Sequence, residues 1–525
     1  MITALITLEG AKRKMSDALM SGTIDRMLQP EFYPHQVKEP IELIQTHVSY
    51  VLLTGEFAYK VKKSVNFGFL DYSTLEKREH FCHQELEMNK RGAPDLYLEV
   101  LAIALVDGKL VLGGSGEIVE YVLKMRQFPQ DVLLSEMFEQ GKLIEAHMED
   151  LGRVVAQYHD RAQTSDRIRS FGEVAQVRQA IDENYEQTTK YIGGPQTQSQ
   201  YEETKRYTDN FFSERSQLFA NRIKNNFIRE CHGDLHLRNI CLWQDKILLF
   251  DCIEFNEPFR FVDVMYDVAF TVMDLQARQC PEFGNAFLNT YVEQTGDWEG
   301  LQVLPLYLSR QAYVRAKVNS FLLDDPGVPA QVKENAKSTA ADYYKLAWEY
   351  TKPRPGRLIL MSGLSGSGKS TTAKHLARKL DAIHIRSDAV RKHLGGIALS
   401  ERGGDDLYTP EMTQKTYDRL LQLGIMLASQ GFAVILDAKY DRVDLRMNAI
   451  DIADFQQIPL QIIHCSAPID VLKQRLQQRT GDIADATADL LESQIAAAEA
   501  FTPVEQSYVR SLDTSQPIAP QLTKI

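Results

Sequence analysis

The feature that most constrains the fold is a glycine-rich segment between an apolar strand pattern and a helix pattern. In RLILMSGLSGSGKSTTAKHLA, which starts at Arg357, the spacing G-x-x-x-x-G-K-S runs from Gly363 to Ser370. Glycines let backbone N–H groups curl around an anion, and the start of a helix adds partial positive charge. This order of strand, loop and helix predicts a phosphate-binding loop beside a parallel sheet.

Each part of this loop has an expected role. Lys369 is expected to reach the β- and γ-phosphates of a nucleoside triphosphate and to act in catalysis, and Ser370 is expected to hold Mg²⁺. The residues predicted to bind the nucleotide are Gly363, Ser365, Gly366, Ser367, Gly368, Lys369, Ser370 and Thr371.

The rest of the C-terminal region fits the same kind of domain. TKPRPGR, residues 351–357, is rich in proline and glycine and is expected to be a linker. Beyond it, short apolar runs such as AIHIRSD, AVILDA and LQIIHC alternate with helix patterns. This alternation is typical of a parallel sheet wrapped by helices, so we expect an α/β domain over residues 358–525.

Charged residues follow two of these strand runs. Asp388 comes after the second run with Arg391 one helical turn later, and Asp437 ends the third run. Because the carboxyl ends of parallel strands line the ligand crevice, these side chains are expected near the loop. An aspartate there can accept a hydroxyl proton while an arginine holds an anion, so Arg391 and Asp437 are predicted to bind the acceptor substrate.

Two arginines farther along predict a closing segment. Arg475 and Arg479 are expected on one helix face because they are four residues apart. A lid of this kind brings positive charge over the transferring phosphoryl group, so both are predicted to be catalytic.

On these motifs, the C-terminal third resembles the small P-loop kinases related to gluconate kinase, polynucleotide 5′-kinase and zeta toxin. The matched positions are the glycine loop with Lys369 and Ser370, the D-x-x-R pair, Asp437 and the lid arginines. The resemblance implies that Asp388 is the catalytic base.

A second motif lies far upstream, in ECHGDLHLRNICLWQDKILLFD from Glu230 to Asp251. Asn239 follows Asp234 by five residues, and Asp251 ends an apolar run. In kinase-type phosphoryl transfer an Asp orients the acceptor hydroxyl, an Asn five residues later binds Mg²⁺, and a second Asp holds Mg²⁺ after a short hairpin. The spacing therefore predicts a second phosphoryl-transfer site with oxygen ligands that suit Mg²⁺.

The upstream segment resembles the loop H-G-D-x-H-x-x-N of the aminoglycoside phosphotransferase and choline kinase group. The resemblance implies a protein-kinase-like fold with a small β-rich lobe and a helical lobe. It also implies that Asp234 is the catalytic base and that Asn239 and Asp251 are the metal ligands. Asp263 and Asp267 match a region that braces the catalytic loop, and we expect structural roles for them.

That fold needs a strand lysine for the nucleotide phosphates and a helix glutamate that pairs with it. AYKVKK offers Lys60 and Lys62 on one strand face because side chains alternate, and Lys60 fits the A-x-K pattern better. Glu85, in a charged helix pattern, is the predicted partner, with Glu87 as the alternative. Turn residues predict hairpins at Thr54-Gly55-Glu56 and at Asp107-Gly108.

Composition limits the class of protein. At 525 residues the chain is too long for one core. Acidic residues outnumber basic ones by 71 to 59, which disfavours broad binding of nucleic acid or of anionic membranes. None of the six cysteines forms a C-x-x-C pair, which argues against a zinc site. No apolar run reaches roughly 18 residues, so we expect a cytoplasmic protein with reduced thiols and no membrane span.

Taken whole, the chain resembles bacterial two-domain proteins that join an aminoglycoside phosphotransferase-like domain to a small P-loop kinase. The implied fold class is an α+β protein-kinase-like N-terminal domain followed by an α/β P-loop domain with a parallel sheet. The expected boundaries are a lead-in segment 1–40, a kinase-like domain 41–350, a linker 351–357 and a P-loop kinase domain 358–525.

The expected function is that of an ATP-dependent bifunctional phosphotransferase, with ATP and Mg²⁺ as cofactors and hydroxyls of small molecules as acceptors. Two alternatives stay open. One is a single active kinase with a regulatory nucleotide-binding domain, and the other is a nucleic-acid 5′-hydroxyl kinase in the C-terminal half. Replacing Asp234 and Lys369 in two separate variants and assaying each one distinguishes a single active kinase from an enzyme with two active sites.

Overall fold

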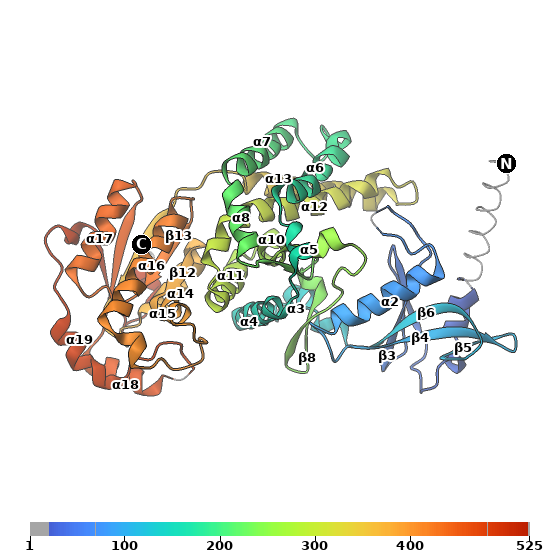
Figure 1. Cartoon of the computed structure of the whole chain (residues 1–525), viewed down its shortest axis with the longest axis horizontal. Coiled ribbons are helices and arrows are strands. Elements are labelled where there is room, and N and C mark those ends of the chain that lie inside the picture. The colour runs from blue at the N-terminus through green and yellow to red at the C-terminus, as the bar shows by residue number, and fades with distance from the viewer. Residues whose placement is uncertain (1–19, 21, 69, 480, 523–525) are drawn as a thin grey trace. The chain divides into compact units, whose positions relative to one another are not determined.

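The computed structural model describes residues 20, 22–68, 70–479 and 481–522. The contacts divide the chain, traced in Figure 1, into two compact units. Unit 1 comprises Met1–Leu143, Tyr158–Gln176 and Ile223–Asp267, and unit 2 comprises Ile144–Gln157, Val177–Arg222 and Val268–Ile525. Residues 1–19 of the expected lead-in segment lie outside the described residues.

A six-stranded sheet, all of whose neighbouring strands are antiparallel, forms the β-rich part of unit 1. Its strand order is β1-β2-β3-β6-β4-β5. Both predicted hairpins are confirmed, because Leu53 pairs with Ala58 and Val106 pairs with Lys109. The strand bounds are β1 Glu42–Gln45, β2 Ser49–Leu53, β3 Phe57–Lys62, β4 Tyr97–Val106, β5 Lys109–Leu112 and β6 Glu117–Arg126.

Helix α2 (Leu75–Asn89) contacts β4 and β6 of this sheet and fixes the position of Glu85. Thr74 caps the helix by accepting a hydrogen bond from the backbone N–H of Lys77. Its buried positions recur every three or four residues, as expected for one helix face. They are Arg78, Cys82, Glu85, Met88 and Asn89.

Residues near the N-terminus form an apolar cluster with the sheet. Met27 and Phe32 are buried against Leu52 and Tyr59. Part of the expected lead-in segment therefore contributes to the core of unit 1.

Short strands and turns carry the upstream motif in unit 1. Strand β7 (Ile228–Glu230) pairs with β10 (Phe261–Asp263), and β8 (Ile240–Trp243) pairs with β9 (Lys246–Leu249), both antiparallel. The 3-10 helix η4 (Leu237–Asn239) lies between β7 and β8. The motif is thus a loop followed by a hairpin, as its spacing predicted.

The first part of unit 2 is helical. Some of these helices have terminal residues that belong to unit 1. Helices α12 and α13 pack against each other, and α7 contacts both. The helix bounds are α4 Glu145–Arg161, α6 Val174–Thr188, α7 Gln198–Glu214, α8 Ser216–Lys224, α10 Val264–Ala277, α11 Pro281–Thr295, α12 Leu304–Asp324 and α13 Ala330–Glu349.

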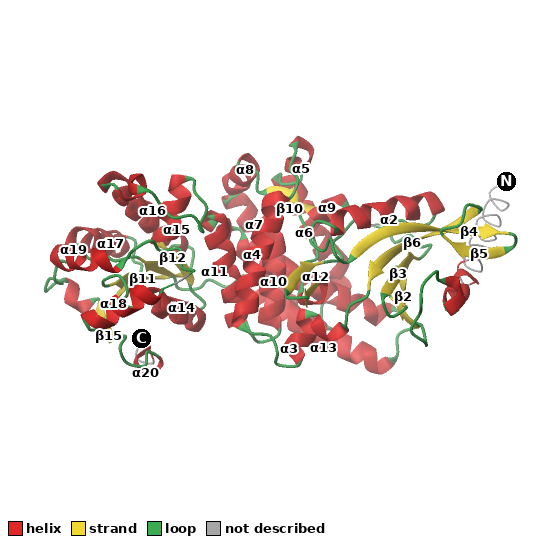
Figure 2. Cartoon of the chain, turned by 90° about the horizontal axis from the view of Figure 1, so that it is seen from below, coloured by secondary structure: helices red, strands yellow, loops and turns green. Residues whose placement is uncertain are grey.

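A five-stranded sheet forms the second part of unit 2, in the order β12-β13-β11-β14-β15. Every neighbouring pair is parallel, which confirms the predicted α/β domain. Figure 2 shows these strands among helices that carry the connections. The strand bounds are β11 Arg357–Ser362, β12 Ile383–Arg386, β13 Ala433–Asp437, β14 Leu460–Ser466 and β15 Val509–Asp513. The helix bounds are α14 Lys369–Leu380, α15 Ser387–Gly395, α16 Pro410–Ala428, α17 Val443–Phe455, α18 Ile469–Gln478, α19 Leu491–Ala497 and α20 Ala519–Leu522.

Polar contacts join the helices of unit 2 to its sheet. The amide of Asn289 on α11 accepts a hydrogen bond from the backbone N–H of His384 (2.7 Å) and donates one to Ala382 O (3.0 Å). This amide therefore satisfies the backbone of the edge strand β12 as a neighbouring strand would. On α14, Arg378 forms ion pairs with Glu145 (3.2 Å) and Glu149 (3.3 Å) of α4.

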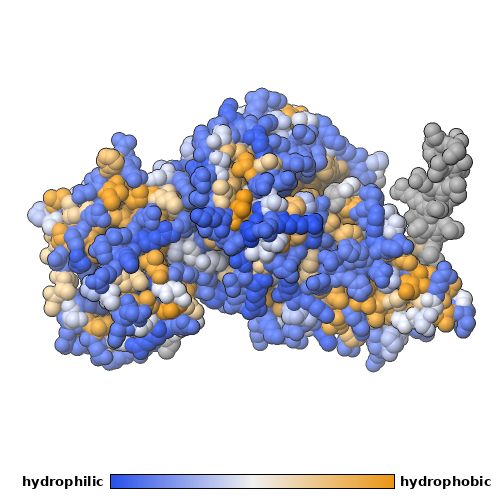
Figure 3. Space-filling model, in the orientation of Figure 1, coloured by the Kyte–Doolittle hydropathy of each residue, from blue (hydrophilic) through white to orange (hydrophobic). Residues whose placement is uncertain are grey.

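The surface is mostly polar on the face seen in Figure 3, where apolar residues form small scattered patches. Among the helices of the described residues, none combines the length and the apolar character that a membrane crossing requires. All six cysteines are free thiols, and five of them are buried.

Candidate active sites

In unit 1, Lys60 on β3 contacts two carboxylates. Its Nζ donates to Glu85 Oε1 at 2.6 Å and to Asp251 Oδ1 at 2.7 Å. Glu87, the alternative partner, is exposed. The structure therefore joins three residues that lie far apart in the sequence and that were predicted to belong to one site.

Lys62 shares the same glutamate. Its Nζ donates to Glu85 Oε2 and to Glu254 Oε1, both at 2.5 Å, and it contacts Tyr72 OH at 3.3 Å. The Lys62 side chain is 2% exposed, whereas that of Lys60 keeps 16% of its surface. Of the two lysines, Lys60 is thus the one that faces Asp251 and is accessible to a ligand.

Burial and charge act in opposite directions on this cluster. Burial alone would raise the pKa of Glu85, but Lys60 and Lys62 hold it at about 2. Burial would lower the pKa of each lysine, yet the carboxylates raise both pKa values well above the usual range. All three groups are therefore charged at neutral pH. Glu254 and Tyr72 were not among the predicted site residues, because neither belongs to a motif.

The upstream catalytic loop is held by Asp267, which was expected to be structural. Its carboxylate accepts hydrogen bonds from the backbone N–H groups of His232 (2.7 Å) and Gly233 (2.8 Å). His159 Nε2 lies 3.2 Å from the same carboxylate. Gly233 has φ +85°, and a Cβ there would lie 2.6 Å from Phe259 O, so the turn requires glycine.

Asp234 and Asn239 meet within this loop. Asn239 Nδ2 donates to Asp234 O at 3.0 Å and to Asp234 Oδ2 at 3.1 Å. His236 Nε2 lies 3.4 Å from Asp234 Oδ2. These contacts orient the predicted base, and they turn the amide nitrogen of Asn239, not its oxygen, towards Asp234.

Two oxygens of the upstream site fit a metal ion. Within the described residues, no group donates a hydrogen bond to Asn239 Oδ1, although the residue is buried. Asp251, held at φ +59°, receives Lys60 on one carboxylate oxygen, and its backbone N–H donates to Tyr97 OH (3.1 Å). Hard oxygen ligands of this kind suit Mg²⁺.

In unit 2, the glycine loop joins β11 to α14 as predicted. Gly363, Gly366 and Gly368 have φ values of +133°, +78° and +82°. A Cβ at Gly363 would lie 2.2 Å from Cys465 O, so this position has no room for a side chain. Lys369 Nζ donates to Leu364 O at 2.8 Å, and its pKa is lowered, chiefly by burial.

The other loop residues differ in their surroundings. Ser365 donates its backbone N–H to Gln494 Oε1 at 3.0 Å, and the backbone carbonyl of Ser367 accepts from Thr514 Oγ1 at 2.8 Å. Thr371 is exposed on α14. No hydrogen bond joins Ser370 Oγ to another described residue, so this oxygen fits a metal ligand.

Asp388 lies at the start of α15, directly after β12, where the sequence predicted it. Burial raises the pKa of its carboxyl, Asp437 adds to the rise, and Arg386 opposes it. This carboxylate has no hydrogen bond to another described residue. It can therefore accept a proton without first breaking a contact with the protein.

The predicted acceptor-binding residues are both engaged by the protein. Arg391 Nη1 donates to Leu407 O at 2.7 Å, and the Asp437 carboxylate lies 3.0 Å from His384 Nε2. Burial alone would raise the pKa of Asp437, but His384, Arg386 and Lys369 hold it at about 2. The sequence analysis did not assign His384, which becomes informative only when β12 and β13 lie side by side.

The expectation that Arg475 and Arg479 share one helix face is wrong. Helix α18 ends at Gln478, and Arg479 has an extended backbone. Gly481 follows with φ +68°, which takes the chain out of the helix. Arg475 Nη1 donates to Gly366 O (3.3 Å) and to Thr514 Oγ1 (3.0 Å), and Arg479 donates to Ala486 O.

Two acidic residues that follow α18, Asp482 and Asp485, contact Arg386 and Tyr408. Asp482 Oδ1 accepts from Arg386 Nη2 at 2.5 Å, and Asp485 accepts from Tyr408 OH at 2.6 Å. Arg386 Nε is buried and has no hydrogen-bond partner among the residues that the structure describes. No motif marked these residues, because their partners lie about eighty to a hundred positions away.

Comparison with known proteins gives matches to both regions. The family model AAA_33, described as AAA domain, matches residues 358–501. A curated protein of Mycobacterium tuberculosis, "Uncharacterized protein Rv2004c", is 31% identical over 481 residues, which cover 91% of this chain and 93% of the relative. The shikimate kinase of Geobacter sulfurreducens is 29% identical over 133 residues, 25% of this chain and 66% of that kinase.

Among solved structures, a choline/ethanolamine kinase family protein from Mesorhizobium loti is similar over 63% of this chain and 99% of its own, with 9% identity and a TM-score of 0.37. The family model and the shikimate kinase both match by sequence, and together they confirm the resemblance to a P-loop kinase that the glycine motif predicted.

Proposed function

The chain belongs to the family of the Mycobacterium tuberculosis protein Rv2004c, and from this premise we propose that it is an ATP-dependent phosphotransferase with two phosphoryl-transfer sites. Each site transfers the γ-phosphoryl group of ATP to a hydroxyl of a small molecule. ADP leaves, and the hydroxyl proton passes to an aspartate of the protein.

One observation carries the proposal: each site combines a lysine, an aspartate and a side-chain oxygen that fits a metal ion. A lysine is available for phosphate, Lys60 upstream and Lys369 downstream. An aspartate is available for the hydroxyl proton, Asp234 upstream and Asp388 downstream. Asn239 and Ser370 each present an oxygen without a hydrogen bond to another described residue.

In the upstream site, Lys60 is the residue that changes partners. It forms an ion pair with Asp251 in the structure. With a nucleotide bound, Lys60 would contact phosphate oxygens instead, and Asp251 and Asn239 would hold Mg²⁺. Glu85 keeps Lys60 in place throughout, because Glu85 is buried and bonded to both lysines. Mg²⁺, when bound, supplies neutralisation of phosphate charge. Asn239 orients Asp234 towards the acceptor hydroxyl.

In the downstream site, backbone N–H groups of the loop and Lys369 bind the phosphates. Lys369 leaves Leu364 O for a phosphate oxygen. Asp388 accepts the hydroxyl proton of the acceptor, and Arg475 holds the carbonyl of Gly366 so that the loop keeps its shape.

Two single variants and their combination test the proposal. Asp234→Asn and Lys369→Met are compared with wild type in a metabolite extract with ATP and Mg²⁺, and new phosphorylated products are identified by mass spectrometry. We expect each variant to lose one set of products and to retain the other, and the double variant to lose both. Asp131→Asn and Lys415→Met, which change exposed residues, serve as matched controls.

Other outcomes select the alternatives. Loss of every product through one variant alone supports a single active kinase with a regulatory nucleotide-binding region. Transfer of labelled phosphate to a 5′-hydroxyl oligonucleotide, abolished by Lys369→Met, supports nucleic-acid end phosphorylation instead. Wild type without any new phosphorylated product contradicts the proposal.

A further inference from the structure

Unit 2 contains a cavity of about 570 Å³ at the end of the parallel sheet where the strands begin, whereas the glycine loop lies where they end. It lies where β11, β12 and β13 begin, because Arg357, Ile383 and Ala433 line it. The segment 350–357 and residues of α7, α10, α11 and α12 complete the walls. Its volume is in the range of sites for small organic ligands.

The cavity lies apart from the candidate active site. Strands β11, β12 and β13 start at the cavity and end at the glycine loop, before Asp388 and at Asp437 respectively. At a rise of roughly 3.3 Å per residue, the six residues of β11 span about 20 Å. A ligand in the cavity therefore does not contact a nucleotide bound at the glycine loop.

Basic side chains outnumber acidic ones around the cavity, although the whole chain has a net charge of −12. The lining contains Arg215, Lys352, Arg354 and Arg357, against Glu214 and Asp381.

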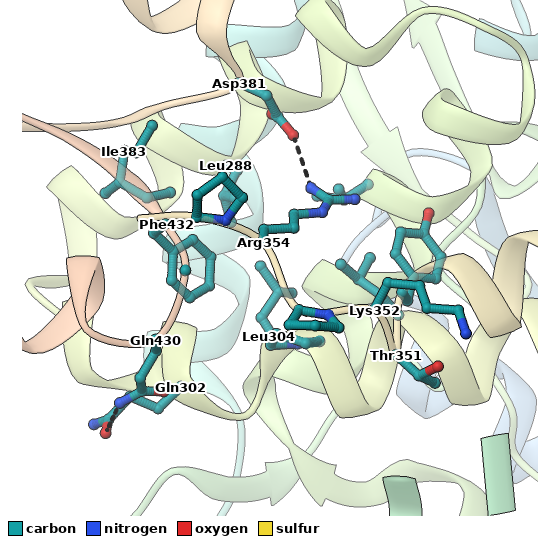
Figure 4. A pocket seen from close by; sticks show the side chains of 18 of the residues that line it. Leu288, Gln302, Leu304, Thr351, Lys352, Arg354, Asp381, Ile383, Gln430 and Phe432 are labelled. Atoms are coloured by element: carbon teal, nitrogen blue, oxygen red, sulfur yellow. Dashed lines mark hydrogen bonds and ion pairs between the residues drawn. The ribbon is translucent and has the colours of Figure 1, made fainter. Parts of the chain in front are cut away.

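The positive charge of two of these arginines is poorly balanced by acidic groups of the protein. Arg354 lies 3.8 Å from Asp381, and Figure 4 shows its side chain reaching towards this carboxylate. Arg357 has no hydrogen bond or ion pair from its guanidinium to another described residue. Arg215 and Lys352 are already bonded, to Gln430 and Glu203. Arg354 and Arg357 are therefore available to an anion.

The remaining walls suit a flat organic group with polar edges. Phe432, labelled in Figure 4, lines the cavity, and Phe211 and Tyr350 add further aromatic surface. Gln430 Nε2 donates to Gln302 Oε1 at 2.7 Å, so a pair of amides lies in the lining of the cavity (Figure 4). Aromatic and amide groups together bind rings that carry hydrogen-bonding substituents.

We propose that this cavity is a second ligand site, which binds a small organic anion: a molecule with a flat ring and a phosphate, sulfonate or carboxylate group. Its anionic group lies between Arg354 and Arg357, and its ring lies against Phe432. Because residues 351–357 form part of the wall, the bound molecule holds this segment against both the helices and the sheet of unit 2.

A matched pair of fluorescent probes tests the proposal on the full-length protein. 8-Anilinonaphthalene-1-sulfonate carries a ring system and an anion, and N-phenyl-1-naphthylamine carries the ring system without the anion. Both are titrated while Mg²⁺ and a non-hydrolysable ATP analogue saturate the nucleotide sites. We expect the sulfonate to bind at least ten-fold more tightly than the neutral probe.

Arginine variants locate the binding. We expect Arg354→Ala with Arg357→Ala to weaken the sulfonate at least ten-fold and to leave the neutral probe unchanged. Arg510→Ala, which removes an exposed arginine on β15, is the matched control and keeps wild-type affinity. Arg354→Ala alone replaces the double variant if circular dichroism shows that the double variant has lost its fold, because Arg354 is exposed. Equal affinity for the two probes, wild-type sulfonate affinity in the arginine variant, or the same loss in Arg510→Ala overturns the proposal.

Discussion

At the scale of single residues, the upstream site depends on a glutamate shared by two lysines. Glu85 is fully buried, and Lys60 and Lys62 each take one of its oxygens. Removing one member of such a cluster leaves buried charge without compensation, which costs more than the intact cluster contributes. Glu85 is therefore important for stability as well as for the position of Lys60.

We predict that Glu85→Gln lowers the free energy of unfolding by about 3–5 kcal/mol at neutral pH, because two buried lysines lose their common partner. Urea unfolding followed by fluorescence measures the loss, and Trp243 reports on unit 1. Glu87→Gln changes an exposed residue on the same helix and is expected to have little effect. A similar loss in both variants contradicts the prediction.

The pH dependence of the same cluster has a defined sign. The pKa of Glu85 is about 2 in the folded protein, below the ordinary 4.5 of a glutamate, so the folded state favours the ionised form. Its contribution to stability is complete above about pH 4.5 and is lost as the pH falls towards 2. The difference between wild type and Glu85→Gln should therefore shrink over this interval. A constant difference between pH 5 and pH 3 contradicts this assignment.

Asp388 is expected to give the downstream reaction a visible pH dependence. Because burial raises its pKa, the ionised base forms at higher pH than for an ordinary aspartate, and kcat/KM should rise with pH through this raised pKa. The measurement uses Asp234→Asn protein, so that only the downstream site is active. Asp388→Asn should reduce the rate by roughly 10²–10⁴-fold, and Asp405→Asn, an exposed control, should not. A rate in Asp388→Asn equal to that of the control excludes Asp388 as the base.

At the scale of elements, an edge strand of the parallel sheet is completed by a helix side chain. Asn289 on α11 pairs with the backbone of β12 on both sides of Ile383. This strand leads directly to Arg386 and Asp388, so α11 takes part in positioning these two residues.

We predict that Asn289→Ala destabilises unit 2 by about 1–3 kcal/mol, because the backbone N–H of His384 on β12 loses its partner. Asn335→Ala removes an exposed asparagine of α13 and serves as the control. Amide hydrogen exchange gives the local measurement: the N–H of His384 should exchange faster in Asn289→Ala than in wild type. Unchanged exchange at His384 would show that this contact does not protect the strand.

At the scale of the whole molecule, the two compact units do not follow the order of the chain. Each unit is built from three segments, and the helices α11, α12 and α13 group with the parallel sheet. The expected domain boundaries near residues 350 and 358 follow the change of sequence pattern and stay a proposal. Within unit 2, the contacts of Asn289 and Arg378 join helices and sheet across this change of pattern.

We predict that residues 354–525 produced alone unfold at a lower urea concentration than the same region in the full chain. The fragment exposes the edge of β12 and leaves Arg378 without Glu145 and Glu149. Hydrogen exchange of β12 peptides compares the region in the two forms. Equal protection in both would mean that the helices contribute nothing to the stability of the sheet.

The sequence alone was sufficient for the features that depend on local pattern. The glycine loop, the hairpin turns and the alternation of strands and helices follow from spacing and from backbone preferences within short segments. The pairing of Lys60 with Glu85 was also within reach, because a resemblance supplied the expected partner for a strand lysine. Arg479 shows the limit of such reasoning, since spacing of four implies a shared face only while the helix continues, and α18 ends at Gln478.

The sequence by itself determined which local elements form and which residue types gather at each motif, because backbone geometry and side-chain periodicity act over a few residues. Only the tertiary structure decided that Lys62 and Glu254 share Glu85, that Asp482 meets Arg386, and that Asn289 completes β12. These contacts join segments tens to hundreds of residues apart. Their formation depends on how the elements pack, which no short pattern in the chain specifies.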